Sequence, residues 1–200
     1  MDTSSIVMVS RHRPVEPQWR YDTTARWLHW SLALMIPIQL GLGWTMMAFE
    51  DTPGSATYFD LHKSIGLMLA FAILWRSAWR LTHAPAALPA SVPRWPARVA
   101  RVSHWLLYGS MLVLPLTGYL GAAFSADGVA LFGWPLPRWA PNDGTAREAL
   151  FSAHSAIATA FAVLIALHVL GALKHRLIDR DGVFERMRAG KPRRVESTTS

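Results

Sequence analysis

"HSAIATAFAVLIALH", residues 154–168, has a histidine at each end, and the thirteen residues between them carry no charge. Fourteen residues make nearly four helical turns, so His154 and His168 share one helix face and lie about 21 Å apart along its axis. Burying an imidazole without a polar partner costs free energy, on the order of 1–3 kcal/mol. We therefore expect a bound group to satisfy both histidines.

The composition of the 200-residue chain is that of a membrane protein. Only 16% of its residues are charged, against about 25% in an average soluble domain. Four stretches lack Asp, Glu, Lys and Arg, namely 27–49, 64–75, 102–126 and 149–173. A span needs about 20 apolar residues, so 64–75 crosses only if its flanking basic side chains extend to the headgroups. A soluble bundle would need polar helix faces, which are missing, so we predict an all-α integral membrane four-helix bundle.

The basic residues predict how the chain is oriented. Of the 20 Lys and Arg, 17 lie before the first stretch, between the second and third, or after the fourth. The positive-inside rule then places both termini in the cytoplasm, and the net charge of +7 reflects topology rather than nucleic-acid binding. We expect a cytoplasmic segment at 1–25, a four-span domain at 26–176 and a basic cytoplasmic tail at 177–200, without a cleaved signal peptide.

The connecting segments differ in character. Residues 82–101 are rich in proline and arginine and predict an irregular connection on the inner surface. Residues 127–148 form the longest outer segment, which we expect to lie over the membrane surface. The tail from Lys191 has the composition of a disordered segment.

Five of the eight histidines lie in or at the ends of the apolar stretches, and three do not. His12, His83 and His175 fall in basic segments, where we expect solvated surface residues. Counting depth along the spans puts His62 and His154 near the outer surface, and we call this pair the outer layer. His29 and His168 fall near the inner surface, and we call them the inner layer. Ionisable residues inside a membrane usually face the bundle interior and serve function.

Two imidazoles from two helices at each depth suit the axial positions of a haem iron. Zinc fits less well, because a structural site wants four protein ligands, and a polar contact or proton relay remains the plainer alternative. The sequence has no cysteine, which excludes disulfides, thiolate-held clusters and covalent haem attachment. Small residues would let a flat macrocycle approach the helices, although ordinary helix packing also explains them; they are Gly43, Gly66, Ala158 and Ala172.

The sequence resembles the bacterial di-haem cytochrome b561 family over residues 20–176. The resemblance rests on "YDTTARWLHW", "DLHKSIG", "SHWLLYGSMLVLPLTGY" and the two histidines of the fourth stretch. It implies an inner-membrane four-helix bundle that passes electrons between quinones and other carriers. It also implies two b-type haems with His29, His62, His154 and His168 as axial ligands, and it places His104 near the inner haem without making it a ligand.

Three basic residues are candidates for the haem propionates. Arg76 and Arg80 lie 14 and 18 residues after His62, so one of them would reach the inner haem. Lys63 would serve the outer haem. An arginine fork suits a carboxylate, but ordinary positive-inside flanking explains all three residues equally well.

Several functions remain open at this stage. With both axial positions filled, outer-sphere electron transfer is the chemistry left, so we expect an electron carrier between a donor and the quinone pool. One version of this carrier oxidises superoxide at the outer face. A second class is a haem-containing anchor subunit of a larger dehydrogenase or hydrogenase, and a third class is a haem-free proton-coupled transporter. The expected partners are the lipid bilayer, a quinone, and a small periplasmic electron donor or redox protein, with no nucleic acid.

Overall fold

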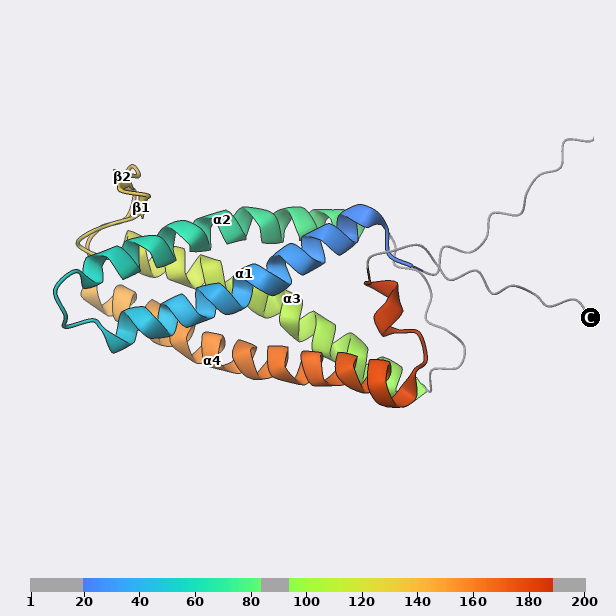
Figure 1. Ribbon diagram of the computed structural model, residues 1–200. Helices are drawn as coiled ribbons and strands as arrows, with labels where there is room; N and C mark the ends of the chain where they lie inside the picture. Colours follow the sequence, from blue (N-terminus) through green and yellow to red (C-terminus); the bar gives the residue numbers. More distant parts are fainter. Residues whose placement is uncertain (1–19, 84–93, 189–200) are drawn as a thin grey trace, which may run out of the picture.

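Four long helices make up the bundle in the computed structural model, which describes residues 20–83 and 94–188 (Figure 1). They are α1 (Thr23–Ala48), α2 (Ser55–Thr82), α3 (Arg94–Ala123) and α4 (Gly144–Lys174). Successive helices pack against each other, α1 on α2, α2 on α3 and α3 on α4. All four are long and apolar enough to cross a membrane. The predicted all-α membrane four-helix bundle is confirmed.

The helices are longer than the charge-free stretches, and this corrects one expectation. Helix α3 begins at Arg94, so residues 94–101 of the 82–101 segment are helical rather than irregular; residues 84–93 lie outside the described part. Pro96 does not prevent this start, because the first turn of a helix needs no backbone N–H donor there. The basic residues Arg98 and Arg101 therefore belong to the beginning of α3.

Asp22 caps the first helix and ties it to the second. Its carboxylate accepts a hydrogen bond from the Ala25 N–H at 2.8 Å and from the indole N–H of Trp79 at 3.1 Å. Burial would raise the pKa of Asp22, but these two hydrogen bonds, with His83 nearby, hold it below its usual value. The start of α1 is thus fixed against the end of α2.

A short hairpin lies beside the start of α2, outside the four helices (Figure 1). Strand β1 (Ala130–Leu131) pairs antiparallel with β2 (Trp134–Pro135). The turn residues Phe132 and Gly133 both have positive φ, 48° and 84°, as the tightest hairpin turns require. The Phe132 N–H donates to the hydroxyl of Ser64 at 2.8 Å, and Ser64 is only 1% exposed. The outer segment is therefore fastened onto α2 and not merely laid over it.

The hydrophobic core lies between the two histidine layers. It is built from Leu32, Leu69, Ile73, Met111 and Phe161, with Ile36 among the side chains packed around it. Phe161 is seven residues from both histidines of α4, about 10 Å from each along the axis. The apolar packing that holds the bundle together thus separates the two polar layers.

The chain after α4 folds back onto the start of α1. A π-helix, η1 (His175–Asp179), leads to a 3-10 turn, η2 (Phe184–Arg186). Beyond it, the carbonyl of Met187 accepts the indole N–H of Trp30 at 2.8 Å, and Arg186 is buried with 4% exposure. The predicted tail 177–200 therefore begins with a packed segment, whereas its expected disorder from Lys191 concerns residues outside the described part.

Candidate functional site

The outer layer brings the rings of His62 of α2 and His154 of α4 close together. Their ring centres are 6.2 Å apart and the ring planes are nearly perpendicular, at 85°. Each ring lies against a glycine of a neighbouring helix. A Cβ at Gly43 would lie 3.1 Å from Cε1 of His62, and one at Gly118 would lie 3.1 Å from Cε1 of His154. The two glycines leave space for the imidazole rings, and a larger residue at either position would fill that space.

The inner layer pairs His29 of α1 with His168 of α4 at 6.4 Å between ring centres and 74° between planes. His104 of α3 joins them, with its ring centre 5.3 Å from that of His168. Its Nδ1–H donates to the carbonyl of Ala100 at 2.6 Å, because a carbonyl can only accept. The five histidines of the apolar stretches thus gather at two depths, as their positions in the sequence predict.

The spacing within both pairs suits a metal held from opposite sides. A bond from a metal to an imidazole nitrogen is about 2 Å long. Two imidazoles on opposite sides of one metal therefore have ring centres roughly 6 Å apart, after about 1 Å of ring radius is added on each side. The observed 6.2 Å and 6.4 Å agree with that separation, whereas the 5.3 Å of His104 and His168 falls short of it.

The hydrogen bonds of His154 leave the right nitrogen free for a metal. Its Nδ1 lies 3.0 Å from the carbonyl of Leu114 and 3.2 Å from the Thr117 hydroxyl. The carbonyl fixes the proton on Nδ1, so the lone pair of Nε2 stays available. Metal-bound histidines usually carry such a partner on the other nitrogen. It comes from the neighbouring helix α3, and not from the adjacent Ser155, a local candidate in the sequence.

Arg76 reaches into the inner layer. One guanidinium nitrogen lies 3.3 Å from Nδ1 of His29, and another donates to the Ala25 carbonyl at 3.2 Å. A guanidinium only donates, so here Nδ1 of His29 accepts and Nε2 carries the proton. For Nε2 to bind a metal, Arg76 has to turn to another acceptor, and a carboxylate is its best partner. A haem propionate meets that requirement.

Lys63, Arg80 and Gly66 do not contact the paired histidine rings in the way that Arg76 does. Lys63 forms an ion pair with Asp60 at 2.9 Å, and Arg80 lies in the last turn of α2. A Cβ at Gly66 would lie 3.1 Å from the amide nitrogen of Gln39. In this structure Gly66 therefore makes room for a side chain of α1.

Sequence reasoning missed three residues that surround the outer layer, Gln39, Leu114 and Gly118. Gly118 had a usable signal, because it follows His104 by 14 residues as Gly43 follows His29. Gln39 is the one amide side chain in the charge-free stretch 27–49. Leu114 contributes a backbone carbonyl, which no side-chain pattern indicates.

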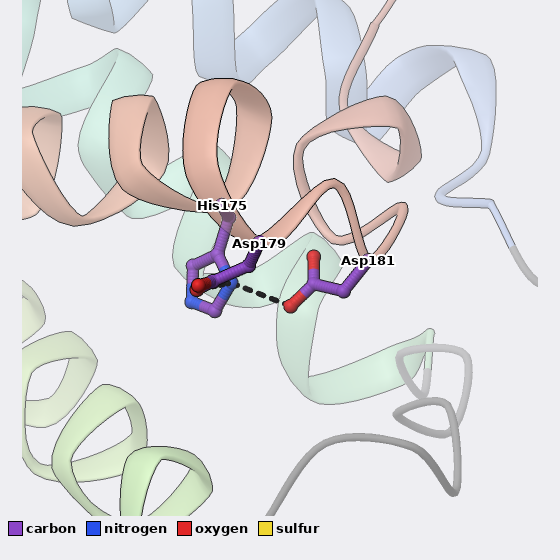
Figure 2. A group of neighbouring side chains, drawn as sticks. All are labelled: His175, Asp179 and Asp181. Carbon is purple, nitrogen blue, oxygen red and sulfur yellow. Dashed lines mark hydrogen bonds and ion pairs between the residues drawn. The ribbon is translucent and has the colours of Figure 1, made fainter.

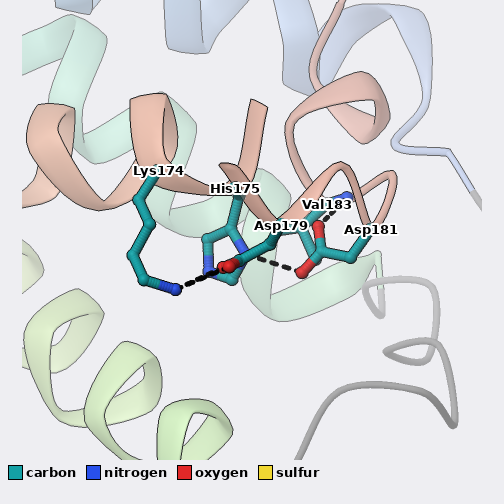
Figure 3. Close-up of polar contacts among 5 residues, drawn as sticks. All are labelled: Lys174, His175, Asp179, Asp181 and Val183. Atoms are coloured by element: carbon teal, nitrogen blue, oxygen red, sulfur yellow. Dashed lines mark hydrogen bonds and ion pairs between the residues drawn. The ribbon is translucent and has the colours of Figure 1, made fainter. Parts of the chain in front are cut away.

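A second polar cluster lies at the end of α4 (Figure 2). The side chains of His175, Asp179 and Asp181 bring one potential ligand atom each within 4.8 Å of one another. These atoms already have protein partners: Nδ1 of His175 lies 2.7 Å from Asp181, Lys174 donates to Asp179 at 2.8 Å, and Asp181 also accepts the Val183 N–H (Figure 3). The cluster fastens the turn after α4, and His175 is half-buried there rather than solvated.

A membrane-spanning helical bundle with paired histidines at two depths defines a class of protein, the membrane-bound b-type cytochromes. The profile of the prokaryotic cytochrome b561 family matches residues 20–190, and this chain belongs to that family. It is accordingly a multi-pass membrane protein of electron transfer with b-type haem as its cofactor.

Curated relatives match over most of their length. Cytochrome b561 homolog 2 of Escherichia coli (strain K12) is 29% identical over 171 residues, which cover 84% of this chain and 90% of the relative. Cytochrome b561 homolog 1 of the same organism is 25% identical, with 84% and 96% covered. A protein named probable superoxide oxidase CybB, from Yersinia pestis, is 23% identical, with 84% and 95% covered.

Proposed function

We propose that this chain holds two b-type haems, the outer one between His62 and His154 and the inner one between His29 and His168. The observation that carries the proposal is the pair of neighbouring imidazoles at each depth, with ring centres 6.2 Å and 6.4 Å apart. The glycines beside the outer rings and the carbonyl partner of His154 support it further. Arg76 is the candidate to bind an inner propionate, since its guanidinium already lies beside His29.

Haem held by His62 and His154, and by His29 and His168, would supply reversible one-electron chemistry. The residues of this chain then hold the two redox centres at opposite ends of the bundle and keep water away from the space between them. Four histidines fix the positions, and the core around Phe161 fills the intervening layer. This arrangement favours an electron carrier that exchanges electrons with a membrane quinone at one end.

The orientation belongs to the same proposal. With 17 of the 20 Lys and Arg on one side, both termini and the inner layer face the cytoplasm of a bacterial inner membrane. The outer layer then faces the periplasm, where a small electron donor or a redox partner protein would have access. A reporter that is active only in the periplasm, fused after Glu196, is expected to be silent; strong activity would reverse the two layers.

Superoxide oxidation at the outer layer is the second candidate. One relative carries that name at 23% identity, and Lys63 stands next to His62 in the sequence. Its positive charge would favour an anionic donor. The ion pair of Lys63 with Asp60 reduces the charge offered to such a donor, so quinone-linked electron transfer remains the leading function.

Haem stoichiometry and electron exchange test the proposal in turn. A pyridine haemochrome assay on the purified protein is expected to give two extractable haems per chain, and one haem at full occupancy would overturn the assignment. His154→Ala should remove the outer haem and leave the spectrum of the inner haem intact.

Stopped-flow mixing with quinol, and separately with a superoxide source, identifies the donor. If neither reduces the protein and quinone does not reoxidise it, the chain is the haem-containing anchor of a larger dehydrogenase or hydrogenase.

A further inference from the structure

The buried amide of Gln39 is bound to the residue that carries the outer imidazole on α2. Its Nε2–H donates to the backbone carbonyl of His62 at 2.8 Å. The other amide atom, Oε1 of Gln39, is buried without a hydrogen-bond partner, and so is Nδ1 of His62. Among the described residues, a hydrogen-bond acceptor on Gln39 and a ring nitrogen on His62 are thus left without a partner, although the two residues are already joined by a hydrogen bond.

The position of the His62 ring places its unsatisfied nitrogen on the side of α1. A Cβ at Gly43 would lie 3.1 Å from Cε1 of His62 and 3.5 Å from Nδ1. Gly43 follows Gln39 by four residues, so both lie on one face of α1. The helix that carries the free Oε1 is therefore the helix that the Nδ1 edge of the ring faces.

Gly66 provides the space for this amide. A Cβ at position 66 would lie 3.1 Å from Nε2 of Gln39, which is closer than ordinary van der Waals contact allows. Gly66 stands one turn after His62 on α2, next to the carbonyl that Gln39 holds. The absence of a side chain at this position lets the amide lie flat against α2.

The two histidines of the outer layer differ in the partner of Nδ1. His154 has the Leu114 carbonyl at 3.0 Å, whereas Nδ1 of His62 has none. A metal-bound histidine almost always donates its other N–H to an oxygen, which fixes the ring and raises its basicity. His62 offers its backbone carbonyl as an acceptor and its ring Nδ1–H as a donor, and the amide of Gln39 offers an NH₂ group that donates and an oxygen that accepts.

We propose that Gln39 is the positioning residue of the outer haem, with Nε2–H on the His62 carbonyl and Oε1 accepting the His62 Nδ1–H. The inference rests on the proposed ligation of that haem by His62. An acceptor on Nδ1 makes the imidazole a stronger donor to iron and stabilises the oxidised state. Gln39 therefore lowers the midpoint potential of the outer haem and leaves the inner haem unaffected.

A redox titration that resolves both haems tests this assignment in the purified full-length protein. Gln39→Met keeps the length of the side chain and removes both polar atoms. We expect it to raise the potential of the outer haem by about 30–60 mV, which is a three- to tenfold change in the one-electron equilibrium. Gln39→Glu retains an acceptor and should not raise the potential. Thr45→Val is the matched control, because the Thr45 hydroxyl donates only within α1, to Gly41.

The outcomes separate this inference from the function on which it rests. A shift or loss confined to the outer haem in Gln39→Met, which Gly66→Ala should reproduce by crowding the amide, supports the positioning role. Unchanged potentials, or equal changes at both haems, overturn it while the two-haem proposal stands. Fewer than two haems in the unmodified protein would instead refute the proposed function, and with it the basis of the inference.

Discussion

Replacing Gly118 by alanine is expected to damage the outer haem site, although the same replacement at Gly109 should help the protein. Both glycines lie inside α3. A Cβ at Gly109 meets nothing within 4 Å, whereas one at Gly118 would lie 3.1 Å from Cε1 and 3.2 Å from Nδ1 of His154. Because glycine inside a helix costs about 0.5–1 kcal/mol relative to alanine, Gly109→Ala should stabilise the protein by about that amount.

The size of the effect at Gly118 follows from how firmly His154 is held. The ring must move by a few tenths of an ångström to restore ordinary contact. Its Nδ1 lies 3.0 Å from the Leu114 carbonyl, an ordinary hydrogen-bond distance, and a movement of a few tenths of an ångström away from it passes the usual limit of about 3.2 Å. Losing that bond costs about 1 kcal/mol, which cancels the gain from alanine. Disturbing a partner of a metal ligand typically lowers metal affinity about 10–100-fold, so the outer haem should bind that much more weakly.

Haem retention and thermal unfolding of the purified variants measure the two effects separately. Gly118→Ala should lose the outer haem on dilution while Gly109→Ala keeps both haems and melts at a higher temperature. Gly43→Ala should also weaken the outer haem, because a Cβ there would lie 3.1 Å from Cε1 of His62. If Gly118→Ala keeps both haems and gains the same stability as Gly109→Ala, the contact between Gly118 and the His154 ring does not shape the site.

Three further predictions concern the framework. Asp22→Ala should lower the free energy of unfolding by about 1–2 kcal/mol. Hydrogen bonds depress the folded-state pKa of Asp22 below 3.8, so this contribution is complete above that pH and disappears as the pH falls through the depressed pKa. Unfolding of both proteins at pH 6 and pH 3 checks the sign. Trp30→Phe removes the donor to Met187 and should speed proteolysis within 183–188; an unchanged cleavage rate would show that this bond does not hold the segment. Phe161→Ala should cost about 3–5 kcal/mol as measured by thermal unfolding in detergent, whereas Val163→Ala, at a position 56% exposed, should cost far less.

The histidine layers could be predicted because they depend only on the α-helix and its rise per residue. Once an apolar stretch is taken as a helix, the rise of about 1.5 Å per residue gives the depth of every histidine in it. His62 and His154 then fall together, as do His29 and His168, and the structure brings both pairs within 6.4 Å. Depth along parallel axes needs no knowledge of how the helices are rotated.

The partners of these histidines could not be predicted in the same way. Whether Nδ1 of His154 meets Ser155 or the Leu114 carbonyl depends on the rotation of α4 against α3, which depth does not determine. The contact of Gln39 with His62 likewise depends on the rotation of α1 against α2, which depth does not determine. The packing of Trp30 against Met187 joins residues 157 positions apart, and a polar basic tail gives no hint of it.

The spacing of 14 residues has a consequence for how the four helices share the site. Each helix repeats a residue of the site at that interval: His29 and Gly43, His62 and Arg76, His104 and Gly118, His154 and His168. The residue halfway along each interval belongs to the core or packs against it: Ile36, Leu69, Met111 and Phe161. Only α4 supplies a histidine to both layers, while α1 and α3 offer a glycine at the outer layer and α2 an arginine at the inner one. The outer layer is therefore shaped by glycines and the inner layer by cationic and additional imidazole groups, so the two proposed haems should differ in potential even with identical ligands.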